Sequence, residues 1–138
     1  MPKWIRDGEL AISTRPGYRT GAEFSVPREA VDRWIAEMRA AGVASIICLL
    51  DDDQLPLYHR SLPEGLLQYY VDSGFQIAHI PTADGQAEPF TPEQLQQAWV
   101  AYRHLPKPVL VHCSAGHDRT GRVVDFILDR EAGVVGDG

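Results

Sequence analysis

The chain has 138 residues, of which 44% are hydrophobic and 23% are charged, and its formal net charge is -6. These values are typical of one globular domain, which we expect to span residues 1–138. The negative charge argues against a general nucleic-acid binder or a binder of anionic membranes, because both need a positive surface. Two cysteines are too few for a disulfide framework and no signal peptide or transmembrane run is evident, so we expect a reducing, cytoplasmic compartment.

The N-terminal residues predict a β-hairpin and then a loop with two arginines. Residues 4–12 are mostly apolar on both sides of an Asp7-Gly8 turn, which is typical of two short strands joined by a tight turn. The loop that follows carries Arg15 and Arg19. Either arginine could approach an anionic substrate, although a charged loop residue is more commonly just solvated.

A helix and a buried strand are predicted next. Ser25 is suited to cap the helix and Pro27 to occupy its first turn, so we expect a helix from there to about Ala41. The apolar run at 44–50 predicts a central strand buried on both faces, with Cys48 as a packing residue. The helix residues expected in the core recur at helical spacing and are Val31, Trp34, Ile35 and Met38.

Helix and strand then alternate up to a motif near the C-terminus. Pro63 is suited to begin a helix over 62–72, and residues 75–80 predict another strand. After a loop with glycine and proline, Thr91-Pro92 is a typical helix start. The inner face of this last helix is expected to carry Leu95, Ala98, Trp99 and Tyr102.

The segment from Val109 to Gly121 combines a strand, a short loop and a helix start. The apolar strand leads to Cys113, and Arg119 follows six residues later in a helix that we expect to reach about Glu131. A loop that curls between the two residues can point backbone N–H groups inward, toward the positive end of the helix. Such a loop is suited to hold an oxyanion, and Arg119 adds a planar fork of donors for two phosphate oxygens.

The residues of this loop suggest a nucleophile and its supports. Cys113 is expected as a thiolate, the attacking form, because a helix N-terminus and a nearby cation both stabilise negative charge. Gly116 suits a positive φ angle or a close approach of backbone to ligand. His112 could hydrogen-bond into the loop, and the Thr120 hydroxyl could ease departure of the thiolate from a phosphorylated intermediate. The backbone groups expected to bind phosphate belong to Ser114, Ala115, Gly116, His117, Asp118 and Arg119.

The same residues allow interpretations other than catalysis. A lone cysteine after an apolar strand is usually a small core residue. A glycine-containing turn between strand and helix could bind phosphate without any chemistry. His112, Cys113 and His117 also suggest a metal site, but adjacent ligands on a tight turn lack the usual zinc spacing, so we expect neither a metal nor a cofactor.

The pattern His-Cys-x5-Arg-Thr-Gly at 112–121 resembles the signature of the cysteine-dependent protein tyrosine phosphatases, and the compact size resembles their dual-specificity branch. The resemblance implies hydrolysis of a phosphate monoester through a phosphocysteine intermediate. It implies as substrate a protein that carries phosphotyrosine, phosphoserine or phosphothreonine, or a small phosphate ester.

The resemblance also gives roles to two acidic loops. Family members place a general-acid aspartate on a loop a few tens of residues before the nucleophile, and Asp84 fits that position. Chemistry asks for such an acid as well, because the leaving alkoxide or phenoxide is strongly basic. Similar phosphatases often carry an acid on the loop that here begins with Asp51, which could orient Arg119 or serve as an auxiliary acid. Both aspartates could also be ordinary turn residues.

The order of elements predicts an α/β fold of the phosphatase type. A mostly parallel central sheet, flanked by helices on both faces, is expected after the N-terminal hairpin. Relatives usually continue through one or two helices after the signature helix, whereas this sequence ends at Gly138. We therefore expect either a minimal fold or a form that lacks those helices.

One residue of the loop leaves the substrate open. Phosphatases that prefer phosphoinositides often show Gly-Lys-Asp-Arg-Thr-Gly, and here His117 stands in place of the lysine. A phosphoinositide or another non-protein phosphate is therefore an alternative substrate. A catalytically inert module that binds a phosphorylated partner is an alternative from another class.

Overall fold

The chain folds around one central sheet. Its strands are β1 (Lys3–Arg6), β2 (Leu10–Ser13), β3 (Ser45–Cys48), β4 (Gln76–His79) and β5 (Val109–His112). The computed structural model describes residues 2–19, 25–82, 90–116 and 118–137, within which the strand order is β1-β2-β5-β3-β4. β1 and β2 are antiparallel, and the other neighbours are parallel. The expected mostly parallel sheet with an N-terminal hairpin is confirmed.

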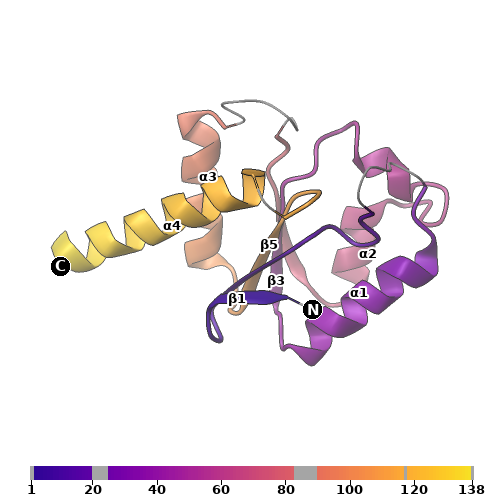
Figure 1. Ribbon diagram of the computed structural model, residues 1–138, viewed down its shortest axis with the longest axis horizontal. Coiled ribbons are helices and arrows are strands. Elements are labelled where there is room, and N and C mark those ends of the chain that lie inside the picture. The colour runs from indigo at the N-terminus through magenta and orange to yellow at the C-terminus, as the bar shows by residue number, and fades with distance from the viewer. Residues whose placement is uncertain (1, 20–24, 83–89, 117, 138) are drawn as a thin grey trace.

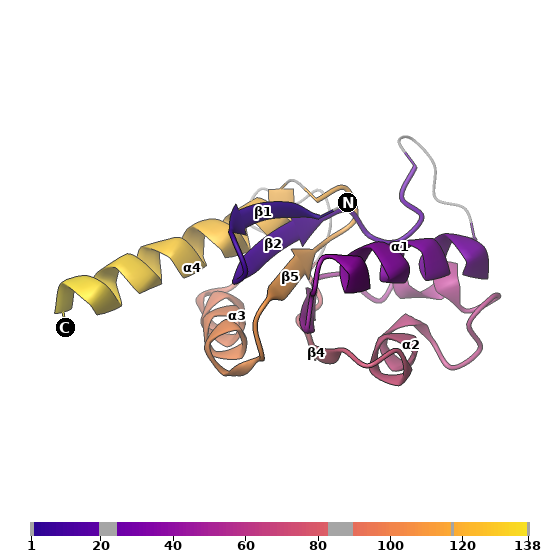
Figure 2. The same ribbon diagram turned by 90° about the horizontal axis from the view of Figure 1, so that it is seen from below.

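Helices cover both faces of this sheet. They are α1 (Arg28–Ala40), α2 (Leu66–Asp72), α3 (Pro92–His104) and α4 (Asp118–Asp137), with a short 3₁₀ helix η1 (Leu55–Tyr58). α1 and α2 lie on one face, and α3 and α4 on the other (Figures 1 and 2). Because consecutive strand residues point to opposite faces, Ile46 and Cys48 pack with α1 and α2, whereas Ile47 packs with α3 and α4. β3 is thus buried on both faces, as expected.

The core face of α1 is confirmed, but its predicted cap is wrong. The four residues expected in the core are all buried. The N-cap is Pro27 with ψ 151°, an extended conformation, and no side chain caps the helix. The helix therefore begins at Arg28, which leaves Ser25 outside the position from which a side chain caps the first turn.

α2 begins later than the sequence predicts. Gly65 has a φ of 91° and a ψ of 163°, which is incompatible with a helix, so the helix begins at Leu66 rather than near residue 62. Pro63 lies in the turn before it. η1 was not predicted, because four residues with a proline carry no helical periodicity.

Of the two C-terminal helices, α3 begins where the sequence predicts and α4 is longer than the sequence predicts. α3 begins as expected, with Thr91 and Gln94 forming a reciprocal capping box. α4 continues to Asp137 instead of ending near Glu131, and it projects beyond the rest of the chain (Figure 1). An interior glycine costs a helix only about 1 kcal/mol, so Gly133 and its neighbours do not end it. Among the described residues, no helix has the length and apolarity needed to cross a membrane.

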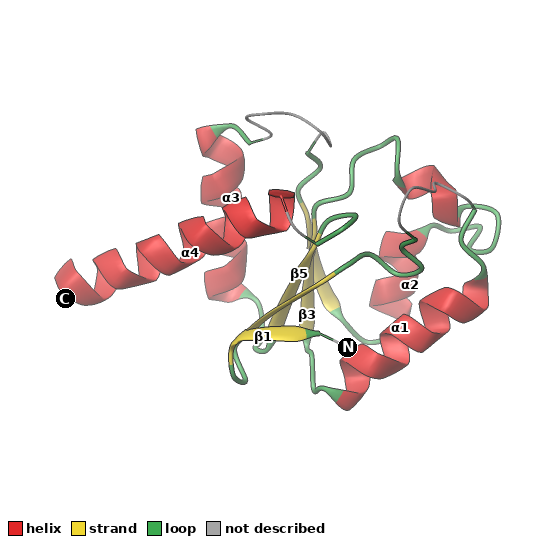
Figure 3. Cartoon of the chain, in the orientation of Figure 1, coloured by secondary structure: helices red, strands yellow, loops and turns green. Residues whose placement is uncertain are grey.

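The parallel strands place several loops at one edge of the sheet. The loops after β3, β4 and β5 leave the sheet on the same side (Figure 3). β5 is central, with β2 and β3 as parallel neighbours, and all of its residues are buried. The residue after β5 is therefore delivered to the middle of this edge, where open α/β sheets bind ligands.

A core substitution in β5 tests this arrangement. Leu110 is fully buried against α1 and α2. We expect Leu110→Ala to lower the free energy of unfolding by about 2–5 kcal/mol, because it removes packed methyl groups and leaves a cavity. Urea denaturation followed by circular dichroism measures this. Val71→Ala, at a side chain that is 47% exposed, is the control, and an equal effect of both changes would contradict the fold.

Candidate active site

Cys113 lies directly after β5 and is only 3% exposed. The three residues after it form a tight bend, and α4 begins at Asp118. The strand, loop and helix predicted for the signature are therefore present in that order. Because β5 is hydrogen-bonded on both sides, it holds the Cys113 backbone in a fixed position.

His112, the last residue of β5, contacts the backbone at the start of the loop. Its Nδ1 lies 2.9 Å from the carbonyl oxygen of Cys113, and its Nε2 lies 2.9 Å from the Tyr70 hydroxyl. A carbonyl only accepts, so Nδ1 carries the proton and Nε2 accepts the hydrogen bond from Tyr70. Burial lowers the pKa of His112 to about 4, and the Arg119 and Arg15 cations act in the same direction. The imidazole is therefore neutral, and its expected contact with the loop is confirmed.

Gly116 is required by two independent features of the loop. Its φ is 79°, which side chains rarely adopt. A Cβ at this position would also lie 2.8 Å from the carbonyl oxygen of Ser13. The sequence predicted a positive φ or a close approach, and the structure has both. The approaching group is the backbone after β2, so the phosphate loop packs directly on the segment that begins at Ser13.

Arg119 is buried at the carboxyl edge of the sheet, with 2% exposure. Its Nη1 donates to the carbonyl oxygens of Leu49 at 3.2 Å and Thr82 at 2.8 Å. It also donates to Oε1 of Gln54 at 3.0 Å. These acceptors come from the loops after β3 and β4. The Arg119 guanidinium is therefore held by two loops that are separate from its own helix, α4.

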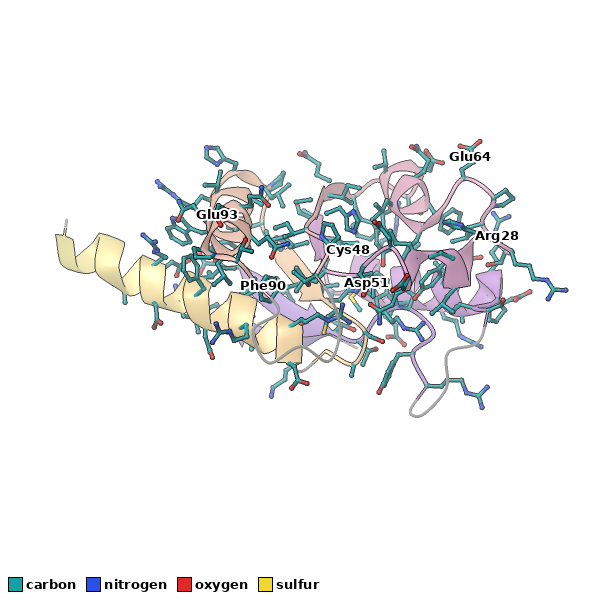
Figure 4. All side chains as sticks on the ribbon, turned by 90° about the horizontal axis from the view of Figure 1, so that it is seen from above. Arg28, Cys48, Asp51, Glu64, Phe90 and Glu93 are labelled. Atoms are coloured by element: carbon teal, nitrogen blue, oxygen red, sulfur yellow. The ribbon has the colours of Figure 1, made fainter. Side chains whose placement is uncertain are left out.

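Asp51 forms hydrogen bonds within the turn that follows β3. Its Oδ1 accepts hydrogen bonds from the backbone N–H groups of Asp53 and Gln54, both at 3.0 Å. Its carboxylate thus shapes the turn, and the side chain of this loop that contacts Arg119 is Gln54. In the view of Figure 4, Asp51 and Cys48 project close together, since Cys48 ends β3 and Asp51 follows it by three residues. The turn that Asp51 shapes carries Gln54 to Arg119, and the roles of Asp51 in orienting Arg119 and as an auxiliary acid stay predictions.

Two more residues lie at the loop without a clear signal in the sequence. Arg15, which was expected to be solvated or to approach the substrate, is buried and donates from Nε to Oγ of Ser114 at 3.1 Å. Nothing in the sequence distinguishes it from Arg19. Gln54 is likewise buried, although an uncharged residue after an acidic run is normally exposed.

Of the other residues considered in the sequence, Thr120 and Cys48 lie in the described part of the chain. Thr120 is buried, and its hydroxyl has no hydrogen-bond partner among the described residues. Cys48 is a packing residue, as expected, because it is fully buried in the core beside α1 and α2, and this burial raises the pKa of its thiol to about 12. The described part of the chain contains no group of three His, Cys, Asp or Glu side chains that could hold a metal ion. Asp84 and His117 lie outside the described residues, and their roles stay predictions.

Comparison with known proteins agrees with this geometry. A family model described as "Polymorphic toxin system, DSP-PTPase phosphatase" matches residues 20–132. The chain belongs to this phosphatase family. It is therefore a hydrolase of the protein tyrosine or dual-specificity phosphatase type. No curated protein matches the phosphatase.

Solved structures of phosphatases share its fold. Tk-PTP in a mutant form is 26% identical with a TM-score of 0.64, and the match covers 96% of this chain and 73% of that one. Kinase associated phosphatase, with its catalytic cysteine replaced by serine, is 24% identical with a TM-score of 0.64, covering 86% and 64%. The PP-IP phosphatase SIW14 from S. cerevisiae is 18% identical with a TM-score of 0.55, covering 85% and 58%.

The neutral state of His112 in this phosphatase predicts a pH dependence of stability. The pKa of His112 is about 4 when folded, against 6.5 ordinarily, so the unfolded chain binds more protons between these values. We therefore expect its contribution to the free energy of unfolding to be complete above pH 6.5 and to be lost as the pH falls toward 4. Urea denaturation at several pH values in this range measures it. His112→Gln should lack this component, whereas the exposed control His104→Gln should keep it. An unchanged pH slope in His112→Gln would contradict the assignment.

Proposed function

We propose that the phosphatase hydrolyses phosphate monoesters of proteins, on tyrosine and also on serine or threonine, through a phosphocysteine intermediate. One observation carries this proposal. Cys113 directly follows the central strand, and the short loop after it joins this strand to the helix that carries the buried Arg119. A thiol at a helix N-terminus beside a guanidinium is the arrangement that favours an attacking thiolate.

The first step transfers the phosphoryl group to sulfur. The Cys113 thiolate attacks phosphorus in line, an S–P bond forms, and the bond to the ester oxygen breaks. Arg119 and the backbone N–H groups of residues 114–119 hold the equatorial oxygens, which stabilises the charge of the transition state. The hydrogen bonds of Arg119 Nη1 with Leu49, Thr82 and Gln54 support this step because they fix the guanidinium before substrate arrives.

Asp84 is the proposed general acid of this step and the general base of the next. It protonates the leaving oxygen, then takes a proton from the water that attacks the phosphocysteine and breaks the S–P bond. Its place in the sequence supports the assignment, since Thr82, two residues earlier, gives its carbonyl oxygen to Arg119. Two residues of chain span at most about 7 Å. In the second step the Thr120 hydroxyl donates to the departing thiolate, a role that suits its lack of a partner among the described residues.

Removal of the nucleophile tests the mechanism. We expect the parent to hydrolyse 4-nitrophenyl phosphate in the presence of EDTA and a reducing agent, and Cys113→Ser to show only the background rate, because no phosphocysteine can form. The measurement is nitrophenol release, with mass spectrometry of the acid-quenched parent for the covalent phosphate. Cys48→Ser, at the other buried cysteine, is the matched control and should retain activity. Equal rates for the parent and Cys113→Ser would contradict the proposal.

The acid is tested by the dependence on the leaving group. We expect Asp84→Asn to lower kcat/KM by about 10²–10⁴-fold for phenyl phosphate, the usual range for general acid catalysis. The loss should be smaller for 4-nitrophenyl phosphate, whose leaving group is less basic. The variant should also lose the fall in activity at high pH that deprotonation of the acid causes. Glu88→Gln, at an acidic residue four positions further along the sequence, is the control. An equal loss for both substrates would rule out Asp84 as the acid.

The type of phosphate is settled by a substrate panel. Phosphotyrosine and phosphoserine peptides, a phosphoinositide and an inositol polyphosphate should be compared by kcat/KM with the same preparation. Preference for the peptides supports the proposed protein phosphatase. Preference for either inositol compound would assign the enzyme to non-protein phosphates, and binding of phosphopeptide without turnover would indicate a binding module.

A further inference from the structure

Arg15 forms two hydrogen bonds with Ser114 in the loop that we propose binds phosphate. Its backbone N–H donates to the carbonyl oxygen of Ser114 at 2.9 Å, and its side-chain Nε donates to Oγ of the same serine at 3.1 Å. Ser114 directly follows the nucleophile. The position of the first loop residue after Cys113 therefore depends on a residue that lies 99 positions away along the chain.

The guanidinium of Arg15 is itself held in place. Its Nη1 donates to the Tyr58 hydroxyl at 3.2 Å, and Tyr58 donates to the carbonyl oxygen of Pro16 at 2.6 Å. Trp34 fixes the chain just before Arg15, since its Nε1 donates to the Thr14 carbonyl oxygen at 3.0 Å. The side chain is thus set in one orientation from η1 and from α1.

Arg15 carries a buried charge with neutral contacts. It is 2% exposed, and its hydrogen-bond acceptors among the described residues are a serine hydroxyl, a tyrosine hydroxyl and a carbonyl. Tyr58 stays neutral because burial raises its pKa to about 12. No carboxylate within the described ranges forms an ion pair with Arg15. A buried cation of this kind is costly unless an anion lies near it.

The anion that suits this charge is the one bound in the loop. Arg15 donates to Ser114, the first loop residue after Cys113, and Arg119 lies in the first turn of the helix that follows this loop, so both buried cations flank the same loop. A phosphate dianion and a thiolate at Cys113 would bring more negative charge to the site than one arginine can balance.

We propose that Arg15 is a positioning residue of the reaction, which holds Ser114 in the phosphate-binding shape of the loop and supplies a second buried positive charge for the bound phosphoryl group. This inference rests on the proposed function. It assigns to the loop after β2 a share in substrate binding that the signature motif does not contain. Arg15 does not attack or donate a proton; it acts through Ser114 and through its charge.

Replacement of Arg15 by a neutral residue of similar length tests the proposal. We expect Arg15→Met to raise the inhibition constant of inorganic phosphate about tenfold or more, because a charge-assisted hydrogen bond and a cation are lost. kcat/KM for 4-nitrophenyl phosphate should fall by a similar factor. Arg15→Lys keeps the charge but not the fork, so it should recover part of the phosphate affinity. Arg39→Met removes an exposed arginine that lies over Phe75, and it should match the parent.

A purely structural role gives a different result. It would lower the melting temperature of Arg15→Met while leaving both constants within about twofold of the parent, a difference of about 0.4 kcal/mol, when they are measured well below that temperature. This outcome would overturn the inference. If Arg15→Met does not fold, Arg15→Lys takes its place, because lysine lacks the Nε donor to Ser114, and parental constants in this variant would overturn the positioning role.

The inference and the proposed function can fail separately. If the parent is active and Arg15→Met is folded and equally active, only the inference fails. If the parent hydrolyses no ester, the proposed function fails, and stabilisation by inorganic phosphate then tests Arg15. Phosphate should raise the melting temperature of the parent more than that of Arg15→Met, and an equal rise would overturn the inference.

Discussion

A buried guanidinium must donate its hydrogen bonds to oxygen atoms, and in this phosphatase that requirement organises the whole catalytic edge. Arg119 takes its acceptors from Leu49, Gln54 and Thr82, which lie after two different strands. The loops after β3 and β4 are thereby fixed around the loop after β5. Parallel pairing makes this possible, because it brings the carboxyl ends of these strands to one place. The sheet order is therefore part of the site.

The charges around the loop are consistent with one another. Arg15 and Arg119 are both buried near Cys113, while His112 beneath them is kept neutral by burial and by the two cations. A neutral imidazole can donate to the Cys113 carbonyl and accept from Tyr70 at the same time. Positive charge is thus concentrated at the loop after β5, where we propose that the phosphoryl group binds. His112 and Tyr70 therefore support the loop through hydrogen bonds, and the neutral His112 does not add a third cation.

The sequence predicted those features that depend on local spacing. The strand, loop and helix around Cys113 and Arg119 were predicted because they follow one another within a few residues, and α1 was predicted because its apolar side chains recur at helical spacing. Arg15 and Gln54 could not be found, since their contacts with the loop span 99 and 65 positions and their residue types are common on surfaces. The start of α2 depends on the backbone conformation of one residue, Gly65. The length of α4 depends on how much free energy its glycines cost, and the helix continues through them to Asp137. Neither of these two helix boundaries appears as a pattern in the sequence.

The long sequence separation of these contacts has a consequence for biosynthesis. The contacts that shape the loop join residues separated by 42, 70 and 99 positions. Contacts of this kind form slowly, because a long segment must be closed before any of them is made. During translation the N-terminal segments emerge first, so Arg15 is buried only after the ribosome has released the residues of β5 and the loop behind it. The nascent chain therefore carries no assembled phosphate pocket before the segment from Cys113 to Arg119 has left the ribosome.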